Sequence, residues 1–408
     1  LRAAGFPVED AAVHVSGEAG LSKGSGRLYQ QVRAAFPGKR ILHIGDNPET
    51  DVRVPREAGM SVFHYKPAAP AYSDPGSQIL HSLASEADPG WPFWQRLGFR
   101  VVGPLAVAWT LRLAEESRRR GLQTLCFLTR DGYFPKQVYD ALQPLMGFTA
   151  VSRTAFASRR LLGLAAMEQV TAEDWDFLLK PAPAFRVRDF FERVDLPRDR
   201  YEPACRKAGL DPHAVICHHR GFHDPRSKDR LYAAFVEGMD AFYAVRDGLR
   251  ERVQAYWETL GCRSGRLGIV DIGWNASSFD SLRRILGDPA VDCGFYLGVW
   301  RARQAKLPVR EGLQSFLIDG PDAEREEQLI RGGVGVLEFL MGSPGESVRD
   351  LRLGPVGWEP VPLRPGILGP YENTAYAEME SGFQEFLSHF VAACGYLAPG
   401  DGKAFLRD

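Results

Sequence analysis

The sequence predicts an α/β fold in which parallel sheets are built from alternating strands and helices. Two regions support this prediction. Short apolar runs alternate with segments of helical periodicity over residues 11–65, and the alternation returns over residues 124–158 and 267–318. Such alternation favours a doubly wound parallel sheet whose ligands bind at the carboxyl ends of the strands. A 45% share of hydrophobic residues and a 25% share of charged residues are typical of globular proteins.

The first region reads as one β-α-β-α-β unit, which we place in a domain spanning residues 1–68. Hydrophobic periodicity predicts its elements in the order strand 11–15, helix 26–36, strand 40–44, helix 50–58 and strand 61–65. Pro55 lies inside the second helix, so we expect that helix to be short or 3₁₀ in character. Residues 69–90 are rich in Pro, Ala, Ser and Gly, which predicts a linker.

We expect a second α/β domain over residues 91–408. The stretch of about 161–262 shows several helical patterns and almost no strand pattern, so it is interpreted as a helical insertion. The other predicted elements alternate between strand and helix, in the order helix 104–120, strand 124–129, helix 134–142, strand 153–158, and strands 267–272, 294–300 and 314–318.

Charge and cysteine content narrow the classes of partner. Fifty Lys and Arg residues against 51 Asp and Glu residues give a net charge of −1, which argues against nucleic acid as a partner. The longest apolar run, residues 101–111, is well short of the ~20 residues that a membrane span needs. Six scattered cysteines without paired spacing fit reduced thiols in the cytoplasm. The chain begins at Leu1, inside what reads as the end of a helix, so we take it for a fragment.

Acidic residues and a lysine mark the first candidate site. Asp46 and Asp51 follow the strand 40–44, and Lys23 lies upstream of the helix that precedes that strand. Oxygen ligands at a strand end suit Mg²⁺, which binds through one or two carboxylates together with phosphate and water. A lysine at the same edge can neutralise a phosphate or the carboxylates themselves. The alternative to a metal site is that Asp46 and Asp51 only stabilise the turn and cap the following helix.

This arrangement resembles the third and fourth motifs of the haloacid dehalogenase superfamily. The resemblance rests on Lys23, on the Gly45-Asp46-X4-Asp51 string and on the Ala58-Gly59 turn, and it covers about residues 8–65. It implies an Mg²⁺-dependent phosphohydrolase with a Rossmann-like core. Lys23 would then stabilise the phosphate, Asp46 would bind the metal, and Asp51 would be a metal ligand or support one.

The family's nucleophilic aspartate belongs to a strand that would lie upstream of Leu1. A covalent mechanism cannot run without its nucleophile. We therefore expect the 408-residue chain to show no appreciable phosphatase activity on small phosphomonoesters.

A second set of charged residues follows three predicted strands. Because parallel strands deliver their carboxyl ends to one side, we expect these residues to border one pocket for a phosphate, a phospho-sugar or a nucleotide-sugar. The alternative is a structural ion-pair network. The candidate ligand-binding residues are Arg130, Asp131, Arg159, Arg160, Asp271, Gly273 and Asn275.

The second domain also looks like the α/β domain that follows a dehalogenase domain in large bacterial proteins associated with surface-polysaccharide biosynthesis. The segment around Glu338 contributes to this resemblance. Residues 127–132 further resemble the first dehalogenase motif, with Thr129 in the nucleophile's place, which leaves open a second, degenerate phosphatase core. Two other functions stay open: a non-catalytic binding or scaffold module of polysaccharide assembly, and a sugar or phosphoryl transferase carried by the second domain.

Overall fold

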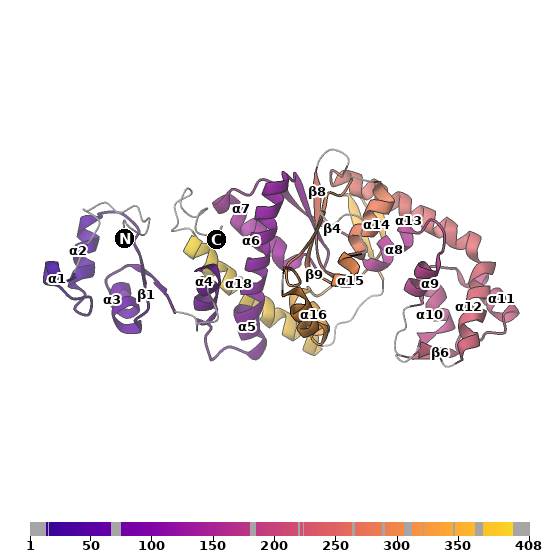
Figure 1. The fold of residues 1–408 in the computed structure, drawn as a ribbon, viewed down its shortest axis with the longest axis horizontal. Helices are drawn as coiled ribbons and strands as arrows, with labels where there is room; N and C mark the ends of the chain where they lie inside the picture. The colour runs from indigo at the N-terminus through magenta and orange to yellow at the C-terminus, as the bar shows by residue number, and fades with distance from the viewer. Residues whose placement is uncertain are drawn as a thin grey trace. The chain divides into compact units, whose positions relative to one another are not determined.

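The computed structural model describes most of the chain and divides it into two compact units (Figure 1). The described residues are 14, 16–66, 75–179, 185–218, 221–222, 224–262, 266–287, 290–305, 312–320, 322–345, 347–363 and 370–394. Unit 1 comprises residues 1–112, 137–148 and 368–408, and unit 2 comprises residues 113–136 and 149–367. The boundaries of these units differ from those of the predicted domains, residues 1–68 and 91–408.

Unit 2 is built on a five-stranded, fully parallel sheet in the order β10-β9-β8-β3-β4, which confirms the predicted α/β fold. The strands are β3 (Thr124–Leu128), β4 (Val151–Ala155), β8 (Leu267–Trp274), β9 (Cys293–Val299) and β10 (Leu313–Ser315). Along the chain, β4 is added on one side of β3, whereas β8, β9 and β10 are added on the other. The strand order thus reverses between β3 and β8, which makes the carboxyl ends of these two strands the switch point of the sheet.

Helices cover this sheet. In Figure 1, α8, α13 and α14 lie together beside it, and these three helices pack on one another. The helices that follow or precede the sheet strands are α6 (Gly103–Arg120), α7 (Tyr133–Met146), α8 (Arg159–Ala166), α13 (Met239–Thr259), α14 (Ser277–Leu286), α15 (Arg301–Gln304), α16 (Ala323–Arg331) and α17 (Val334–Met341).

The region interpreted as a helical insertion is mostly helical, but it also contains a small antiparallel sheet that the sequence pattern did not predict. Its helices are α9 (Ala172–Leu178), α10 (Val187–Arg193), α11 (Arg198–Lys207) and α12 (Pro225–Glu237). The sheet pairs β5 (Phe185–Arg186), β6 (Val215–His218) and β7 (Gly221–Phe222). Buried aromatic side chains such as Phe190 and Phe235 join this region to the same hydrophobic core as β3 and β8.

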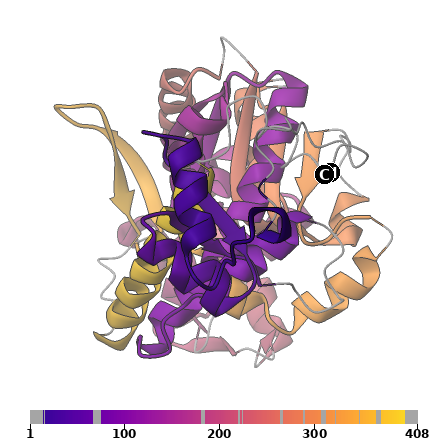
Figure 2. The ribbon, with the colours of Figure 1, turned by 90° about the vertical axis from the view of Figure 1, so that its left-hand side faces the viewer.

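A hairpin of β11 (Val348–Leu353) and β12 (Trp358–Pro362) is a second feature that the pattern did not predict. It is seen as a two-stranded ribbon in Figure 2. Its base is anchored because Arg252 forms two hydrogen bonds of 2.8 Å with Asp350. At its tip, Val356 is fully exposed.

In unit 1, β1 (Leu42–Gly45) and β2 (Ser61–His64) form a two-stranded parallel sheet, close to the predicted strands. Helix α1 (Ser16–Ala19) and helix α2 (Arg27–Ala35) precede β1, and the predicted strand 11–15 lies outside the described residues apart from His14. The predicted helix 50–58 is a π-helical turn, η3 (Pro48–Arg53), followed by α3 (Val54–Glu57). Pro55 occupies the first turn of α3, where its missing N–H costs little.

Part of the predicted linker 69–90 forms helix α4 (Pro75–Ala84), and residues 69–74 lie outside the described residues. Its side chains are in part buried, with Ser82 and Leu83 almost fully covered. The Ser82 hydroxyl also exchanges hydrogen bonds with the backbone of Lys66, which ties α4 to the segment after β2. Gly and Ser are frequent in linkers, but here a first-turn proline and the apolar residues of α4 favour an ordered helix.

In the rest of unit 1, α5 (Phe93–Leu97) and η4 (Gly98–Val102) run continuously into α6 (Figure 1). Helix α18 (Pro370–Cys394) packs closely against α5 and η4. A Cβ atom at Gly98 would lie 2.0 Å from the Met379 carbonyl oxygen, and one at Gly382 would lie 1.9 Å from the Gln95 carbonyl oxygen. Glycine is therefore required on both sides of this crossing.

Within the described residues, the stretch Phe93–Arg120 has the length and apolar composition of a membrane-crossing helix. In the structure, 56% of its most apolar window is buried inside the protein. Phe99, Val102 and Ala106 are fully covered, and Phe99 packs edge-to-face on Phe386 of α18. The apolar composition of this stretch is thus accounted for by its packing in unit 1.

Replacing Gly382 with alanine tests the helix crossing. The added methyl group would overlap backbone atoms of α5, so we expect Gly382→Ala to lower the free energy of unfolding by ~3 kcal/mol. The control is Gly335→Ala in α17, where no atom lies within 4 Å of the new Cβ and helix propensity predicts a small gain. Denaturant unfolding of both variants provides the measurement, and equal stabilities would refute the close crossing.

Candidate functional site

The first predicted site surrounds Asp51 in η3. Lys23 Nζ lies 2.8 Å from Asp51 Oδ1, and His43 Nε2 lies 3.0 Å from the same oxygen. The Tyr29 hydroxyl donates to this oxygen at 3.3 Å, and the Asn47 N–H donates to Oδ2 at 3.3 Å. The structure therefore brings Lys23 and Asp51 together, as the order of elements predicts, and supplies protein donors to both oxygens of the carboxylate.

These donors keep the Asp51 carboxylate ionised. Burial by itself would raise the pKa of Asp51, but hydrogen bonds from Lys23, His43 and the Asn47 N–H outweigh it and lower the pKa to about 2. Only 5% of Asp51 is exposed, and its Cβ packs directly against Gly45. Because the ionised Asp51 is paired with Lys23 and buried by its own chain, it anchors the turn after β1.

The residues here do not fit the magnesium ion that the resemblance implies. Asp51 already has donors at both oxygens, and Mg²⁺ requires carboxylate oxygens that it can approach. Asp46 is exposed, and its backbone carbonyl accepts a hydrogen bond from His64 Nε2 at 3.0 Å. Among the residues that the structure describes, no group of three or more His, Cys, Asp or Glu side chains is arranged to hold a metal ion.

The second predicted site lies in unit 2 at the switch point of the parallel sheet. Asp131 follows β3, and Asp271 lies in the neighbouring strand β8, one residue beyond its last pair with β3. Burial is the largest cause that raises the pKa of Asp131 well above its usual value, and the charge of Asp271 adds to it. Asp131 therefore holds its proton more tightly than a free carboxyl group does.

Hydroxyl groups hold Asp271 in place. The Ser278 hydroxyl from the first turn of α14 donates to Asp271 Oδ2, and it also lies 2.9 Å from the Tyr296 hydroxyl of β9. Tyr296 accepts the Phe279 N–H at 3.1 Å, and burial raises its pKa. The start of α14 is thereby fixed on the paired residues Asp271 of β8 and Tyr296 of β9.

A third acid approaches from α17. The Trp274 indole N–H donates to Glu338 Oε1 at 3.1 Å, and the charge of Glu338 contributes to the raised pKa of Asp131. The segment after α17 is fixed to β3 because the Ser343 N–H donates to the Arg130 carbonyl at 3.0 Å. Arg130 itself is exposed, and its positive charge partly offsets the acids.

Unusual backbone conformations gather at these strand ends. Arg130, Trp274 and Ala276 have φ angles of 72°, 85° and 49°, although non-glycine residues rarely adopt positive φ. Gly273 has a φ of 105°, and a Cβ there would lie 2.6 Å from the Gly298 carbonyl oxygen. Strained backbone of this kind concentrates at functional sites.

The structure separates the predicted arginines by role. Arg160 is almost buried, with Nη2 2.5 Å from Asp195 Oδ2 and Nε 2.6 Å from the Arg193 carbonyl. Arg349 binds the same aspartate at 2.6 Å. Arg160 therefore belongs to an ion-pair network that joins α8 to the insertion and the hairpin, as the alternative interpretation held, whereas Arg159 is exposed at the start of α8.

The Asn275 side chain is also exposed, and the described contact of this residue is made by its backbone. Its carbonyl oxygen accepts a hydrogen bond from Arg303 Nε at 3.0 Å. Helix α14 begins two residues later, after Ala276, and no side chain caps its start. Gly273 and Asn275 thus shape the turn that leads from Asp271 to Ser278.

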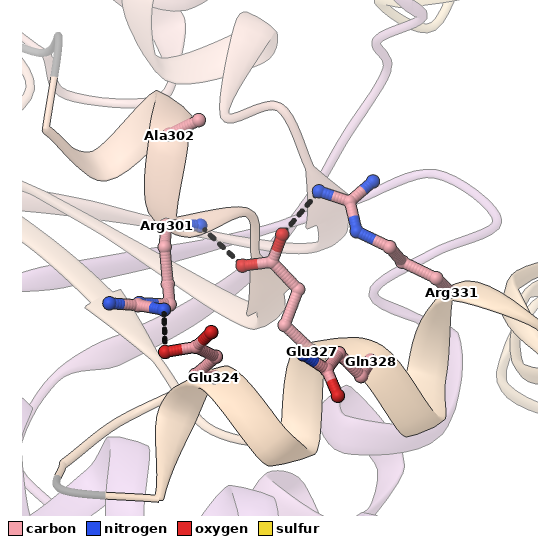
Figure 3. Close-up of a pocket in the computed structure, with 6 residues that line it drawn as sticks. All are labelled: Arg301, Ala302, Glu324, Glu327, Gln328 and Arg331. Carbon is pink, nitrogen blue, oxygen red and sulfur yellow. Dashed lines mark hydrogen bonds and ion pairs between the residues drawn. The ribbon is translucent and has the colours of Figure 1, made fainter.

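A cavity that the sequence analysis missed lies after β9. It has a volume of about 480 Å³ and is lined by Arg301, Ala302, Glu324, Glu327, Gln328 and Arg331 (Figure 3). The buried Glu327 accepts the Arg301 N–H at 2.9 Å and pairs with Arg331. The sequence pattern that singled out Arg130 and Asp131 also applies to Arg301, because Trp300 and Arg301 follow a buried strand in the same way.

Comparison with known proteins finds no match, either to a protein-family model or to a curated protein sequence. The chemical interpretation of both sites therefore depends on their geometry.

The pKa of Asp51 predicts that β1 and its turn are stabilised by an ionised carboxylate. Because the pKa is lowered on folding, this contribution is fully present above pH ~4 and is lost as the pH falls through about 2. We expect Asp51→Asn to lose ~2 kcal/mol of local stability at pH 7 and the difference from the parent to disappear near pH 2.

Hydrogen exchange of peptides covering β1 and β2 measures this local stability. Asp46→Asn is the matched control, because the Asp46 carboxylate is exposed, and it should exchange like the parent at both pH values. A difference between Asp51→Asn and the parent that persists at pH 2 would contradict an electrostatic origin.

The ion pairs of Arg160 predict a structural cost when this arginine is removed. Arg160→Ala leaves the nearly buried Asp195 with Arg349 alone, so we expect a loss of ~2–3 kcal/mol in the free energy of unfolding. Arg159→Ala should change stability by less than ~0.5 kcal/mol, because that side chain is exposed. Thermal melts of the two variants decide the question, and equal losses would contradict the separation of roles.

Proposed function

We propose that this protein is a magnesium-dependent phosphohydrolase acting on a phosphorylated sugar or nucleotide-sugar, and that its active site is in unit 2. The observation that carries the proposal is the placement of Asp131 and Asp271 together at the switch point of the sheet, after β3 and in the neighbouring strand β8. Ligands of open α/β sheets bind in the crevice at this point. An arginine next to the pair and strained backbone on both strands add support.

Asp131 and Asp271 fit a magnesium ion better than the first predicted site does. Neighbouring carboxyl groups that disfavour each other's charge would be stabilised by a cation, and Mg²⁺ needs no more than two protein carboxylates. When bound, the ion would neutralise the charge of a phosphate and polarise it for attack. Ser278 would keep Asp271 oriented, as it does in the structure.

Thr129 is a poor candidate for a nucleophile in this site. Its hydroxyl donates to the Ala157 carbonyl at 3.1 Å and accepts the Ala157 N–H at 3.1 Å. The proposal therefore has no phosphorylated enzyme. A water oxygen forms the new bond to phosphorus, the bond from phosphorus to the sugar oxygen breaks, and the proton lost by water balances the proton gained by the leaving oxygen.

In this proposal, unit 1 supports the protein without catalysis. Its candidate acid, Asp51, is held by Lys23 and His43, which favours the non-catalytic interpretation for that part of the chain. The expectation that the chain lacks phosphatase activity came from the first site alone, and the present proposal replaces it. The resemblance to dehalogenase-type proteins supports a cytoplasmic role in surface-polysaccharide biosynthesis as part of the same proposal.

Removing either carboxylate of the pair should abolish activity while leaving the fold intact. We expect Asp131→Asn and Asp271→Asn each to lower Mg²⁺-dependent phosphate release by about a hundredfold or more. Asn at position 131 has the size of Asp and carries no charge to repel Asp271, so the melting temperature should stay the same or rise. Phosphate release from a panel of sugar phosphates, with and without EDTA, provides the measurement.

Asp280→Asn is the matched control, since Asp280 lies in the first turn of α14 and its only ion pair is a 3.9 Å contact with Arg303 among the described residues. It should retain activity. If Asp46→Asn abolishes turnover and Asp131→Asn does not, the active site belongs to unit 1 and the proposal fails.

A further inference from the structure

The cavity after β9 presents two guanidinium groups on either side of one buried acid. Figure 3 shows Arg301 and Arg331 flanking Glu327, with Glu324 next to Arg301. Only 8% of Glu327 is exposed, and it binds the Arg301 backbone and the Arg331 side chain. Glu327 therefore holds the Arg301 backbone and the Arg331 guanidinium, and both arginines line the cavity.

The two arginines have donors to offer a ligand. Arg331 uses one nitrogen for Glu327, and its guanidinium carbon lies 4.6 Å from the centre of the Trp300 ring. Arg301 Nη1 forms an ion pair of 3.2 Å with Glu324 Oε2, and both side chains are at least half exposed. An exposed ion pair of this kind contributes little stability, so an incoming anion can take the place of Glu324.

The cavity is joined to the carboxylate pair by two stacked indole rings. Trp300 packs on Trp274 with ring centres 5.1 Å apart and planes inclined by 22°. Trp274 in turn donates to Glu338, whose charge acts on Asp131. Arg301 thus follows β9, and Asp271 lies in the neighbouring strand β8, with the two stacked indoles at the ends of these strands.

We propose that Arg301 and Arg331 bind a second phosphate group of the substrate, while its reacting phosphate lies at Asp131 and Asp271. The planar guanidinium groups suit a phosphate, because each can donate two parallel hydrogen bonds. The substrates that meet this requirement are sugar bisphosphates and nucleoside diphosphate sugars. This inference rests on the proposed function and assigns a specificity site to it.

Two substrates with one carbon skeleton test the inference: fructose 6-phosphate, with one phosphate, and fructose 1,6-bisphosphate, with two. The parent protein should show a KM about tenfold lower for the bisphosphate, as expected for added hydrogen bonds between charged groups. Arg301→Gln and Arg331→Gln should each raise the KM for the bisphosphate about tenfold. The kcat and KM for the monophosphate should stay the same.

The control is Arg325→Gln, which removes the same charge from α16 at an exposed position outside the cavity lining. It should leave both KM values unchanged. If all three variants behave alike, or if the parent does not distinguish the two substrates, the inference is overturned.

A binding measurement separates this inference from the proposed function. Calorimetric titration of the same two ligands needs no turnover. If the bisphosphate binds more tightly than the monophosphate and Arg331→Gln removes the difference, the phosphate site stands even where the protein proves catalytically inactive. Equal binding of the two ligands to the parent overturns the site whatever the activity.

Discussion

The proximity of two acids, Asp131 and Asp271, is the constraint on which this end of the parallel sheet in unit 2 depends. Two acids meet there because they come from the neighbouring strands β3 and β8, between which the strand order reverses. Their repulsion opposes folding unless a proton or a cation lies between them. The hydroxyl groups of Ser278 and Tyr296 and the positive φ of Arg130 are features of a site held in place by its surroundings.

In unit 1, an aspartate after a parallel strand has a lowered pKa, opposite to the raised pKa of Asp131 in unit 2. Asp51 also follows a parallel strand and is more completely enclosed, yet its pKa is lowered because cationic and N–H donors reach both oxygens. Within the part of the chain that the structure describes, Asp131 has no such donors on both oxygens: burial is the largest cause that raises its pKa, and the charge of Asp271 adds to it. Burial together with the partners of each carboxyl group, more than its position at a strand end, therefore decides its charge.

Strand-end reasoning predicted the pairs Lys23–Asp51 and Asp131–Asp271, because parallel strands bring their ends to one edge whatever the length of the connection. It could not assign Arg160, whose partner Asp195 lies in the insertion and is reached only through tertiary packing. Arg331 was missed because it ends a helix. The strands β5 and β7 are two residues long, which is too short for an alternating pattern to be recognised.

The outer strands of the parallel sheet have a consequence for association between molecules. An edge strand offers backbone N–H and C=O groups to any other strand that can lie beside it. On one side, β4 exposes Arg153 and Thr154, and an unpaired charge at that position disfavours the approach of a second sheet. On the other side, β10 is only three residues long and gives a foreign strand little to pair with. The sheet that presents the two carboxyl groups is thereby protected against edge-to-edge aggregation.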